Sequence, residues 1–79
     1  MLKLVIAMPC PFCILVTDFI EKNKLNDIEV IDTNWNASIH HELQQKYGKT
    51  QVPLLLIDEK PLYESRDIIE YLRREYELS

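Results

Sequence analysis

The apolar residues of this chain fall into short blocks that predict four β-strands. Residues 2–7 are almost entirely apolar and residues 54–57 are entirely so, as expected for strands that are covered on both faces. Residues 29–32 form a second, shorter strand in which the apolar pair Val30-Ile31 lies between two acidic residues. Residues 61–63 begin with a proline, which cannot donate a hydrogen bond to a neighbouring strand, so we place them at an edge of the sheet.

Three further segments repeat their apolar residues at helical spacing. The first begins around the two cysteines and runs to about Lys24, the second covers residues 37–47, and the third starts near Ser65. Gly48, the only glycine, follows the second segment at the position where helices commonly end in a left-handed residue. The positions that define the three apolar faces are Cys13, Val16, Thr17 and Ile20, then Ile39, Leu43 and Tyr47, and last Ile68, Ile69, Leu72 and Tyr76.

The resulting order of elements is β-α-β-α-β-β-α, which predicts a two-layer α/β domain. The connection between the first two strands has the length of a helical crossover, so we expect these strands to be parallel and the crossover to be right-handed. The 79 residues suffice for one domain, and we assign residues 1–79 to a single unit.

Composition and charge exclude several classes of protein. Nine basic against thirteen acidic residues give a net charge of −4, which argues against nucleic acid as a partner. No apolar stretch reaches the length of a membrane span, and the N-terminal segment lacks the small-residue cleavage site of a signal peptide. Because both cysteines lie in one motif rather than in a disulfide framework, we expect a cytoplasmic protein.

The sequence from Cys10 to Cys13, Cys-Pro-Phe-Cys, carries the strongest chemical signal. At the start of a helix, Cys10 would lie where backbone N–H groups and the helix dipole favour a thiolate, and Cys13 would lie one turn further on the same face. This arrangement suits thiol–disulfide exchange. A zinc half-site and a pair of inert core thiols are the alternatives, but no second Cys-x-x-Cys completes a four-sulfur zinc site.

Three other conspicuous residues carry no sharp functional signal. His40 and His41 are adjacent on a predicted helix, where neighbouring side chains point about 100° apart, so they do not suit a single metal ion and we expect them at the surface. We expect Trp35 to be a partly buried anchor of the loop before the second helix.

Three motifs together resemble those of the glutaredoxins and of the N-terminal domain of glutathione transferases. They are Cys10-Pro11-Phe12-Cys13, Gln51-Val52-Pro53 and the segment of residues 64–72, in matching order and spacing over essentially the whole chain. The resemblance implies an α/β, thioredoxin-like fold with a four-stranded mixed sheet and three helices. It also implies a small dithiol glutaredoxin, a glutathione-dependent thiol–disulfide oxidoreductase with glutathione as co-substrate and no tightly bound cofactor.

The same resemblance implies roles for the residues of the first two motifs. Cys10 would be the nucleophile, and Cys13 would resolve the mixed disulfide formed on it. The peptide bond between Val52 and Pro53 would be cis. The backbone of Gln51 and Val52 would then face Cys10 and pair with the main chain of glutathione or a peptide.

In the third motif, Glu64 and Ser65 match the residues with which glutathione transferases hold the γ-glutamyl end of glutathione. Asp67 matches an acidic position that glutaredoxins use for the ammonium group of the same ligand. These residues also suit plain helix capping, with Ser65 as the N-cap and Asp67 in the first turn. The two roles are compatible.

The chain departs from the glutaredoxin pattern in two places. Many glutaredoxins carry a lysine three residues before the first cysteine, where this chain has Ala7. The double glycine that usually precedes the last helix is replaced by Tyr63 and Glu64. The glycyl carboxylate of glutathione would then pair with Lys49 or His40, or remain solvated.

Three other functions fit the same residues. The chain could be a redoxin-type electron donor recycled by a flavin reductase without glutathione, a non-enzymatic module that binds an iron–sulfur cluster through Cys10 and glutathione, or an interaction domain that shares only the fold. Phe12 either covers the edge of the site or is an ordinary exposed turn residue. The leading interpretation predicts a monomer whose partners are glutathione and disulfide-containing or glutathionylated proteins, with no nucleic acid or membrane partner.

Overall fold

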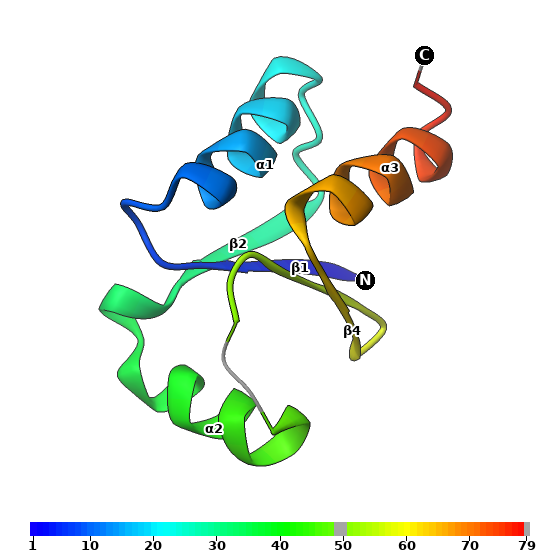
Figure 1. Cartoon of the computed structure of the whole chain (residues 1–79). Coiled ribbons are helices and arrows are strands. Elements are labelled where there is room, and N and C mark those ends of the chain that lie inside the picture. Colours follow the sequence, from blue (N-terminus) through cyan, green and yellow to red (C-terminus); the bar gives the residue numbers. More distant parts are fainter. Residues whose placement is uncertain (49–50, 79) are drawn as a thin grey trace.

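The computed structural model describes residues 1–48 and 51–78, and the elements within them follow the predicted order (Figure 1). A 3₁₀-helix, η1, is added between the second strand and the second helix. The elements are β1 (Leu2–Ile6), α1 (Pro11–Lys22), β2 (Ile28–Asp32), η1 (Thr33–Trp35), α2 (Ala37–Tyr47), β3 (Leu54–Ile57), β4 (Lys60–Tyr63) and α3 (Ser65–Glu75).

The four strands form one mixed sheet in the order β2-β1-β3-β4. β1 runs parallel to β2, with Leu4 opposite Val30, and antiparallel to β3, with Leu4 opposite Leu55. β3 and β4 form an antiparallel hairpin in which Pro61 lies opposite Leu56. The prediction of a parallel first pair is therefore confirmed, and the strand that contains proline lies at the edge of the sheet as expected.

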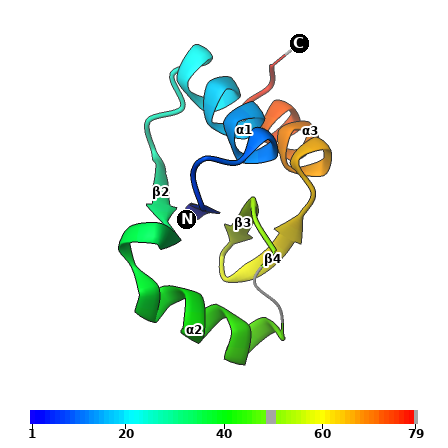
Figure 2. The same cartoon turned by 60° about the vertical axis from the view of Figure 1, so that its left-hand side comes forward.

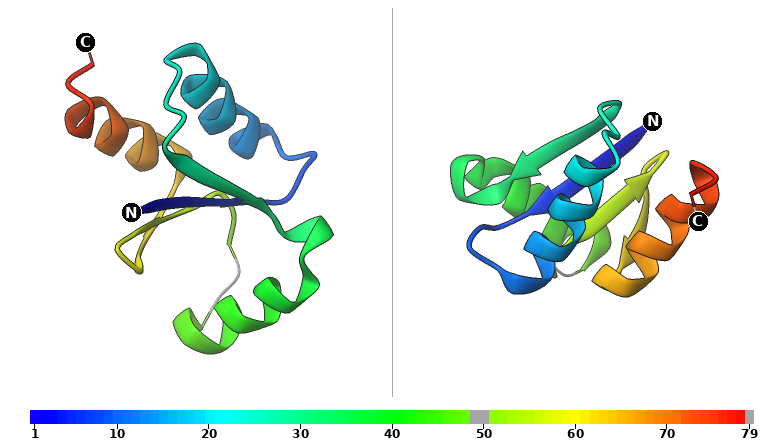
Figure 3. Two further views of the ribbon diagram at one scale, coloured as in Figure 1. Left: turned by 180° about the vertical axis from the view of Figure 1, so that it is seen from behind. Right: turned by 90° about the horizontal axis from the view of Figure 1, so that it is seen from above.

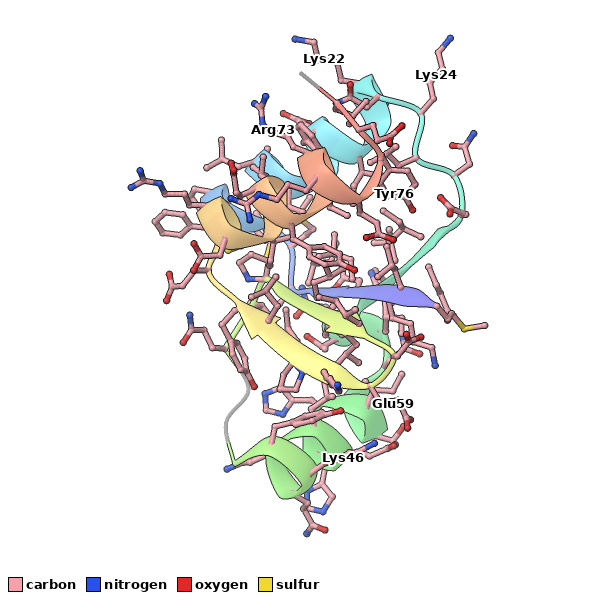
Figure 4. The ribbon with its side chains drawn as sticks, turned by 90° about the vertical axis from the view of Figure 1, so that its right-hand side faces the viewer. Lys22, Lys24, Lys46, Glu59, Arg73 and Tyr76 are labelled. Carbon is pink, nitrogen blue, oxygen red and sulfur yellow. The ribbon has the colours of Figure 1, made fainter. Side chains whose placement is uncertain are left out.

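The helices cover both faces of the sheet, so the prediction of two layers is wrong. α1 and α3 lie on one face and α2 lies on the other (Figures 3 and 4). The reason is the alternation of side chains along β1, because Leu4 packs with the core under α1 and α3 while Val5 packs with Leu43 of α2. The larger cluster contains the buried residues Leu4, Ile6, Cys13, Val16, Ile20, Leu25, Ile28, Leu55, Ile68 and Leu72.

The ends of the helices are fixed by local backbone geometry. α1 ends two residues before the predicted Lys24, which has a positive φ of 54° and so does not continue a right-handed helix. Gly48 follows α2 with φ 79°, as predicted. The hydroxyl of Tyr76, just after α3, donates to Oδ1 of Asp27 at 2.8 Å and ties the end of α3 to the loop before β2 (Figure 4).

The expectation that Trp35 anchors its loop is wrong, since this side chain is 85% exposed. Thr33 anchors the loop instead: it is buried, and its hydroxyl donates to the carbonyl oxygen of Ile6 at 3.1 Å. Asn36 occupies the N-cap position of α2, but its side chain donates to the carbonyl of Asp32 rather than capping the helix.

None of the helices within residues 1–48 and 51–78 is both long enough and apolar enough to cross a membrane.

Candidate active site

Cys10 lies between β1 and α1, at the N-cap position of the helix. Its backbone is extended, with φ −149° and ψ 119°, and its carbonyl accepts the first helical hydrogen bond, from the amide of Ile14 at 2.9 Å. Pro11 follows as the first helical residue, where its fixed φ suits the helix and its missing N–H breaks no bond. The sulfur of Cys10 accepts a hydrogen bond from the backbone N–H of Cys13, with 3.4 Å between the two atoms.

This environment lowers the pKa of the Cys10 thiol. The main cause is the backbone N–H of Cys13, which donates to the sulfur and stabilises the thiolate; the N–H of Phe12 acts in the same sense. Partial burial of Cys10 opposes the shift. The direction agrees with the prediction that a sulfur at the start of a helix is activated even though Ala7 replaces the usual lysine.

Cys13 has the opposite environment. Its side chain is completely buried, and this burial raises its pKa to about 11. The neighbouring Cys10 and the carboxylate of Asp32 add to the shift, whereas the backbone N–H of Ala7 works against it. Both cysteines are free thiols. At neutral pH, Cys13 therefore keeps its proton, and Cys10 is the thiol that ionises more readily.

Asp32 was missed by the sequence analysis. It ends β2 directly opposite Ile6 of the parallel strand β1, which brings its charge near the start of α1. The parallel pairing of residues 2–6 with 28–32 is the signal that could have located it, because the carboxyl ends of parallel strands meet at one edge of the sheet.

The second motif has the predicted backbone conformation. The bond between Val52 and Pro53 is cis; the bond between Met8 and Pro9 is also cis, which the sequence analysis did not predict. Val52 packs against both apolar clusters, and it shares the larger of them with Cys10.

The second and third motifs meet through a side-chain hydrogen bond. Nε2 of Gln51 donates to Oε1 of Glu64 at 3.0 Å, and both residues are exposed. Two of the residues predicted to contact glutathione are thus neighbours although thirteen positions separate them in the sequence.

The predicted N-cap role of Ser65 is wrong. The carbonyl of Glu64 accepts the first helical hydrogen bond of α3, from the amide of Ile68 at 3.0 Å, so Glu64 holds the capping position. Glu64 reaches it with a positive φ of 75° and makes no side-chain capping bond. Ser65 is the first helical residue and is half-buried, while Asp67 lies in the first turn and is exposed.

Cys10 lies at the surface and lines neither of two large cavities. A cavity of ≈ 630 Å³ lies between α2 and the sheet, and Lys46 and Glu59, which form an ion pair at 3.4 Å, stand at its edge (Figure 4). A groove of ≈ 500 Å³ between α1 and α3 includes Ser65 and Leu15. Neither includes Cys10.

The remaining candidates lie elsewhere or cannot be placed. His40 and His41 are both exposed, as predicted. Lys49 lies outside the described residues. Within the described ranges, no three side chains of the types His, Cys, Asp and Glu come together as metal ligands.

The sequence matches the family model described as the glutathione S-transferase N-terminal domain over residues 4–79. No curated protein matches it.

Several solved structures have the same fold. Human glutathione S-transferase T1-1 in its apo form is 26% identical with a TM-score of 0.82, and the match covers 100% of this chain and 34% of that one. An epsilon-class glutathione S-transferase from the housefly, Musca domestica, is 26% identical with a TM-score of 0.77, over 96% of this chain and 35% of that one. A dithiolic glutaredoxin from Trypanosoma brucei brucei is 21% identical with a TM-score of 0.72, and the match covers 98% of this chain and 80% of that one. This chain therefore spans about a third of the length of the two transferases and most of the glutaredoxin.

Proposed function

Because this chain belongs to the glutathione S-transferase N-terminal domain family, we propose that it is a glutathione-dependent thiol–disulfide oxidoreductase of the dithiol glutaredoxin type. Its substrates are protein disulfides and glutathione mixed disulfides, and glutathione is its co-substrate. It acts as a monomer in the cytoplasm.

The observation that carries this proposal is that two thiols one helical turn apart have pKa values shifted in opposite directions. Cys10 is partly exposed and has a lowered pKa, whereas Cys13 is buried and has a pKa raised to about 11. Thiol–disulfide exchange needs one ionised, accessible sulfur to attack, and the dithiol route also needs a second sulfur to resolve the mixed disulfide. Two inert core thiols would not differ in this way, since burial would raise the pKa of both.

The reaction follows from these two environments. The Cys10 thiolate attacks a disulfide sulfur, a new S–S bond forms to Cys10, and the other sulfur of the substrate leaves as a thiolate that takes up a proton. Cys13 then loses its proton and attacks Cys10, which releases the second substrate thiol and leaves a disulfide between the two cysteines. Two molecules of glutathione reduce this disulfide, and their own sulfurs become glutathione disulfide.

The glutathione site that we propose is built from the second and third motifs. The backbone at Val52 pairs with the main chain of glutathione, and Pro53 fixes that segment. Glu64, Ser65 and Asp67 hold the γ-glutamyl end at the start of α3, where the helix dipole favours its carboxylate. The hydrogen bond from Gln51 to Glu64 supports this arrangement because it keeps the two motifs together without the ligand.

The test is turnover of a small glutathione mixed disulfide with competing electron donors. We expect glutathione with glutathione reductase to sustain turnover, and Cys10→Ser to abolish it. Turnover with a flavin reductase alone would indicate the redoxin-type donor, for which the absence of a lysine at Ala7 is the favouring observation. A brown protein that carries iron and sulfide and shows no turnover would indicate the cluster-binding module.

A further inference from the structure

An aromatic side chain stands exposed beside the segment that leads into Cys10. Trp35 is 85% exposed, and neither apolar cluster of the described residues includes it. It lies in η1, directly after β2, while Cys10 follows β1. Since β1 and β2 are parallel, η1 and the start of α1 lie at the same edge of the sheet, as the views in Figures 1, 2 and 3 agree.

Hydrogen bonds connect η1 to the segment before Cys10. The buried hydroxyl of Thr33 donates to the carbonyl of Ile6 at 3.1 Å, and Nδ2 of Asn34 donates to the carbonyl of Met8. Both contacts hold η1 against residues that lie only two and four positions before Cys10. Trp35 is therefore an exposed side chain on a turn that hydrogen bonds hold in place.

The turn itself is also braced. The amide of Asn34 donates to Oδ1 of Asp32 at 2.9 Å, and Nδ2 of Asn36 donates to the carbonyl of Asp32 at 3.0 Å. The residues that flank Trp35 are thus uncharged amides whose side chains are already engaged. Tryptophan is enriched among the residues that contribute most to binding at protein interfaces.

A second exposed aromatic residue lies two positions after the nucleophile. Phe12 is 61% exposed, in the first turn of α1, and its backbone N–H faces the sulfur of Cys10. Phe12 lies two residues after Cys10, and Trp35 lies in the 3₁₀-helix whose side chains are hydrogen-bonded to the segment before Cys10. We call these two side chains the aromatic rim.

We propose that the aromatic rim binds the polypeptide of a protein disulfide substrate, by contact with an aromatic or long aliphatic side chain next to the substrate cysteine that bonds to Cys10. This inference rests on the proposed function. Its support is that both residues lie in segments next to the nucleophile, Phe12 just after it in α1 and Trp35 in the turn bonded to the segment before it, and that neither belongs to the apolar clusters. Glutathione has no large apolar side chain, so exchange with glutathione does not use the rim.

Trp35 is the only tryptophan in the chain, so its fluorescence reports on the rim directly. In a Cys13→Ser variant, which cannot resolve the product, Cys10 is joined through a disulfide to one of three thiols. These are a peptide with phenylalanine beside its cysteine, the same peptide with serine in that place, and glutathione. An activated disulfide of each thiol loads Cys10 chemically, and the added mass confirms the adduct.

We expect the phenylalanine peptide to shift the emission of Trp35 to shorter wavelength and to protect it from acrylamide. The serine peptide and glutathione leave both properties unchanged. Equal emission and quenching in the three adducts would overturn the inference while leaving the proposed function intact. Failure of Cys10 to form any adduct would refute the proposed function, and the inference with it.

Kinetics give an independent check. Trp35→Ala should lower kcat/KM about tenfold for a peptide disulfide with phenylalanine beside its cysteine, and should leave a small glutathione mixed disulfide unaffected. Val30→Ala is the matched control, because Val30 is an exposed apolar residue (47%) on β2, outside the rim. An equal loss on both substrates would mean that Trp35 acts on the fold, and an equal loss in the control would mean that the effect is not specific to the rim; either result overturns the inference.

Discussion

The backbone N–H of Cys13 donates to the sulfur of Cys10 at 3.4 Å, so the residue that would resolve the disulfide also helps to ionise the nucleophile. This contact comes from the main chain and does not depend on the side chain of Cys13. The larger part of the activation of Cys10 can therefore be separated experimentally from the role of the second sulfur, whose side chain adds a smaller effect in the same sense.

The two cysteines should differ sharply when each is replaced by serine. Cys10→Ser should abolish exchange, because it removes the nucleophile. Cys13→Ser should keep activity on glutathionylated substrates and should leave the pKa of Cys10 below its ordinary value, since the backbone N–H remains. Turnover, thiolate absorbance against pH and the mass of a trapped Cys10 adduct check these outcomes. Equal loss from both changes would contradict the assigned roles.

A lysine at position 7 should activate Cys10 further. Ala7 lies directly after β1, three residues before the nucleophile, and a cation there would stabilise the thiolate. We expect Ala7→Lys to lower the pKa of Cys10, and the uncharged Ala7→Met to leave it unchanged. Thiolate absorbance against pH measures both. An unchanged pKa in the lysine variant would show that the backbone N–H groups of Phe12 and Cys13 already dominate.

Burial of Cys13 should make the protein less stable in alkali. In the unfolded chain a thiol ionises at a pKa of about 8.5, whereas in the folded chain the pKa of Cys13 is raised to about 11. Between these values the folded state binds more protons than the unfolded state. The free energy of unfolding therefore falls with rising pH, by at most about 1.4 kcal/mol per pH unit.

The lowered pKa of Cys10 acts in the opposite sense and at lower pH. Its contribution to stability is gained as the pH rises from its folded pKa to its unfolded one, and is lost as the pH falls again. Tyr76, whose pKa is raised to about 12, adds a further loss of folding stability at still higher pH. Urea unfolding of the reduced protein and of Cys13→Ala, compared across this range, isolates the effect of Cys13. If the two curves keep the same slope against pH, the buried thiol is not responsible.

The parts of this protein that follow a local pattern could be predicted from the sequence. The apolar run of β3, the helical spacing of α2 and the place of Gly48 each depend on a few neighbouring residues, and the structure agrees with all three. The position of Cys10 at the start of α1 follows equally from the strand before it and from Pro11.

The features that depend on contacts distant in the sequence were missed or wrong. Trp35 was expected to be a partly buried anchor of its loop, but Thr33 takes the anchoring position through a hydrogen bond to Ile6 of another strand. Asp32 reaches the cysteines only through the pairing of β1 with β2. The parallel pairing itself was predicted from the length of the connection, but the register that places Asp32 opposite Ile6 arises from tertiary packing.

Loss of both Glu64 and Ser65 should weaken the binding of glutathione substrates selectively. The double alanine variant removes the side chains proposed to hold the γ-glutamyl end, including the partner of Gln51. We expect a higher KM for a glutathione mixed disulfide, a nearly unchanged kcat, and no change with a disulfide that lacks glutathione. Asp58→Ala, an exposed acidic change in the turn between β3 and β4, is the control. Equal losses of activity on both substrates would show that Glu64 and Ser65 stabilise the fold and do not bind glutathione.

The backbone at Glu64 should prefer glycine to alanine. Its φ of 75° lies in the region that side chains disfavour, because Cβ crowds the neighbouring backbone, whereas glycine enters it freely. Glu64→Gly and Glu64→Ala both lose the hydrogen bond from Gln51, so their difference isolates the effect of Cβ. We expect the glycine variant to be the more stable by about 1 kcal/mol, which corresponds to a Tm about 4–8 °C higher for a domain of this size.

The neighbouring position supplies the control for this comparison. Ser65 is the first residue of α3, so at that site alanine should be at least as stable as glycine, and the sign of the difference should reverse. Thermal unfolding of the four variants measures both differences. A glycine preference at position 64 alone would mean that this chain accepts backbone strain to place a carboxylate there. An alanine variant as stable as the glycine variant at position 64 would show that the turn relaxes without cost.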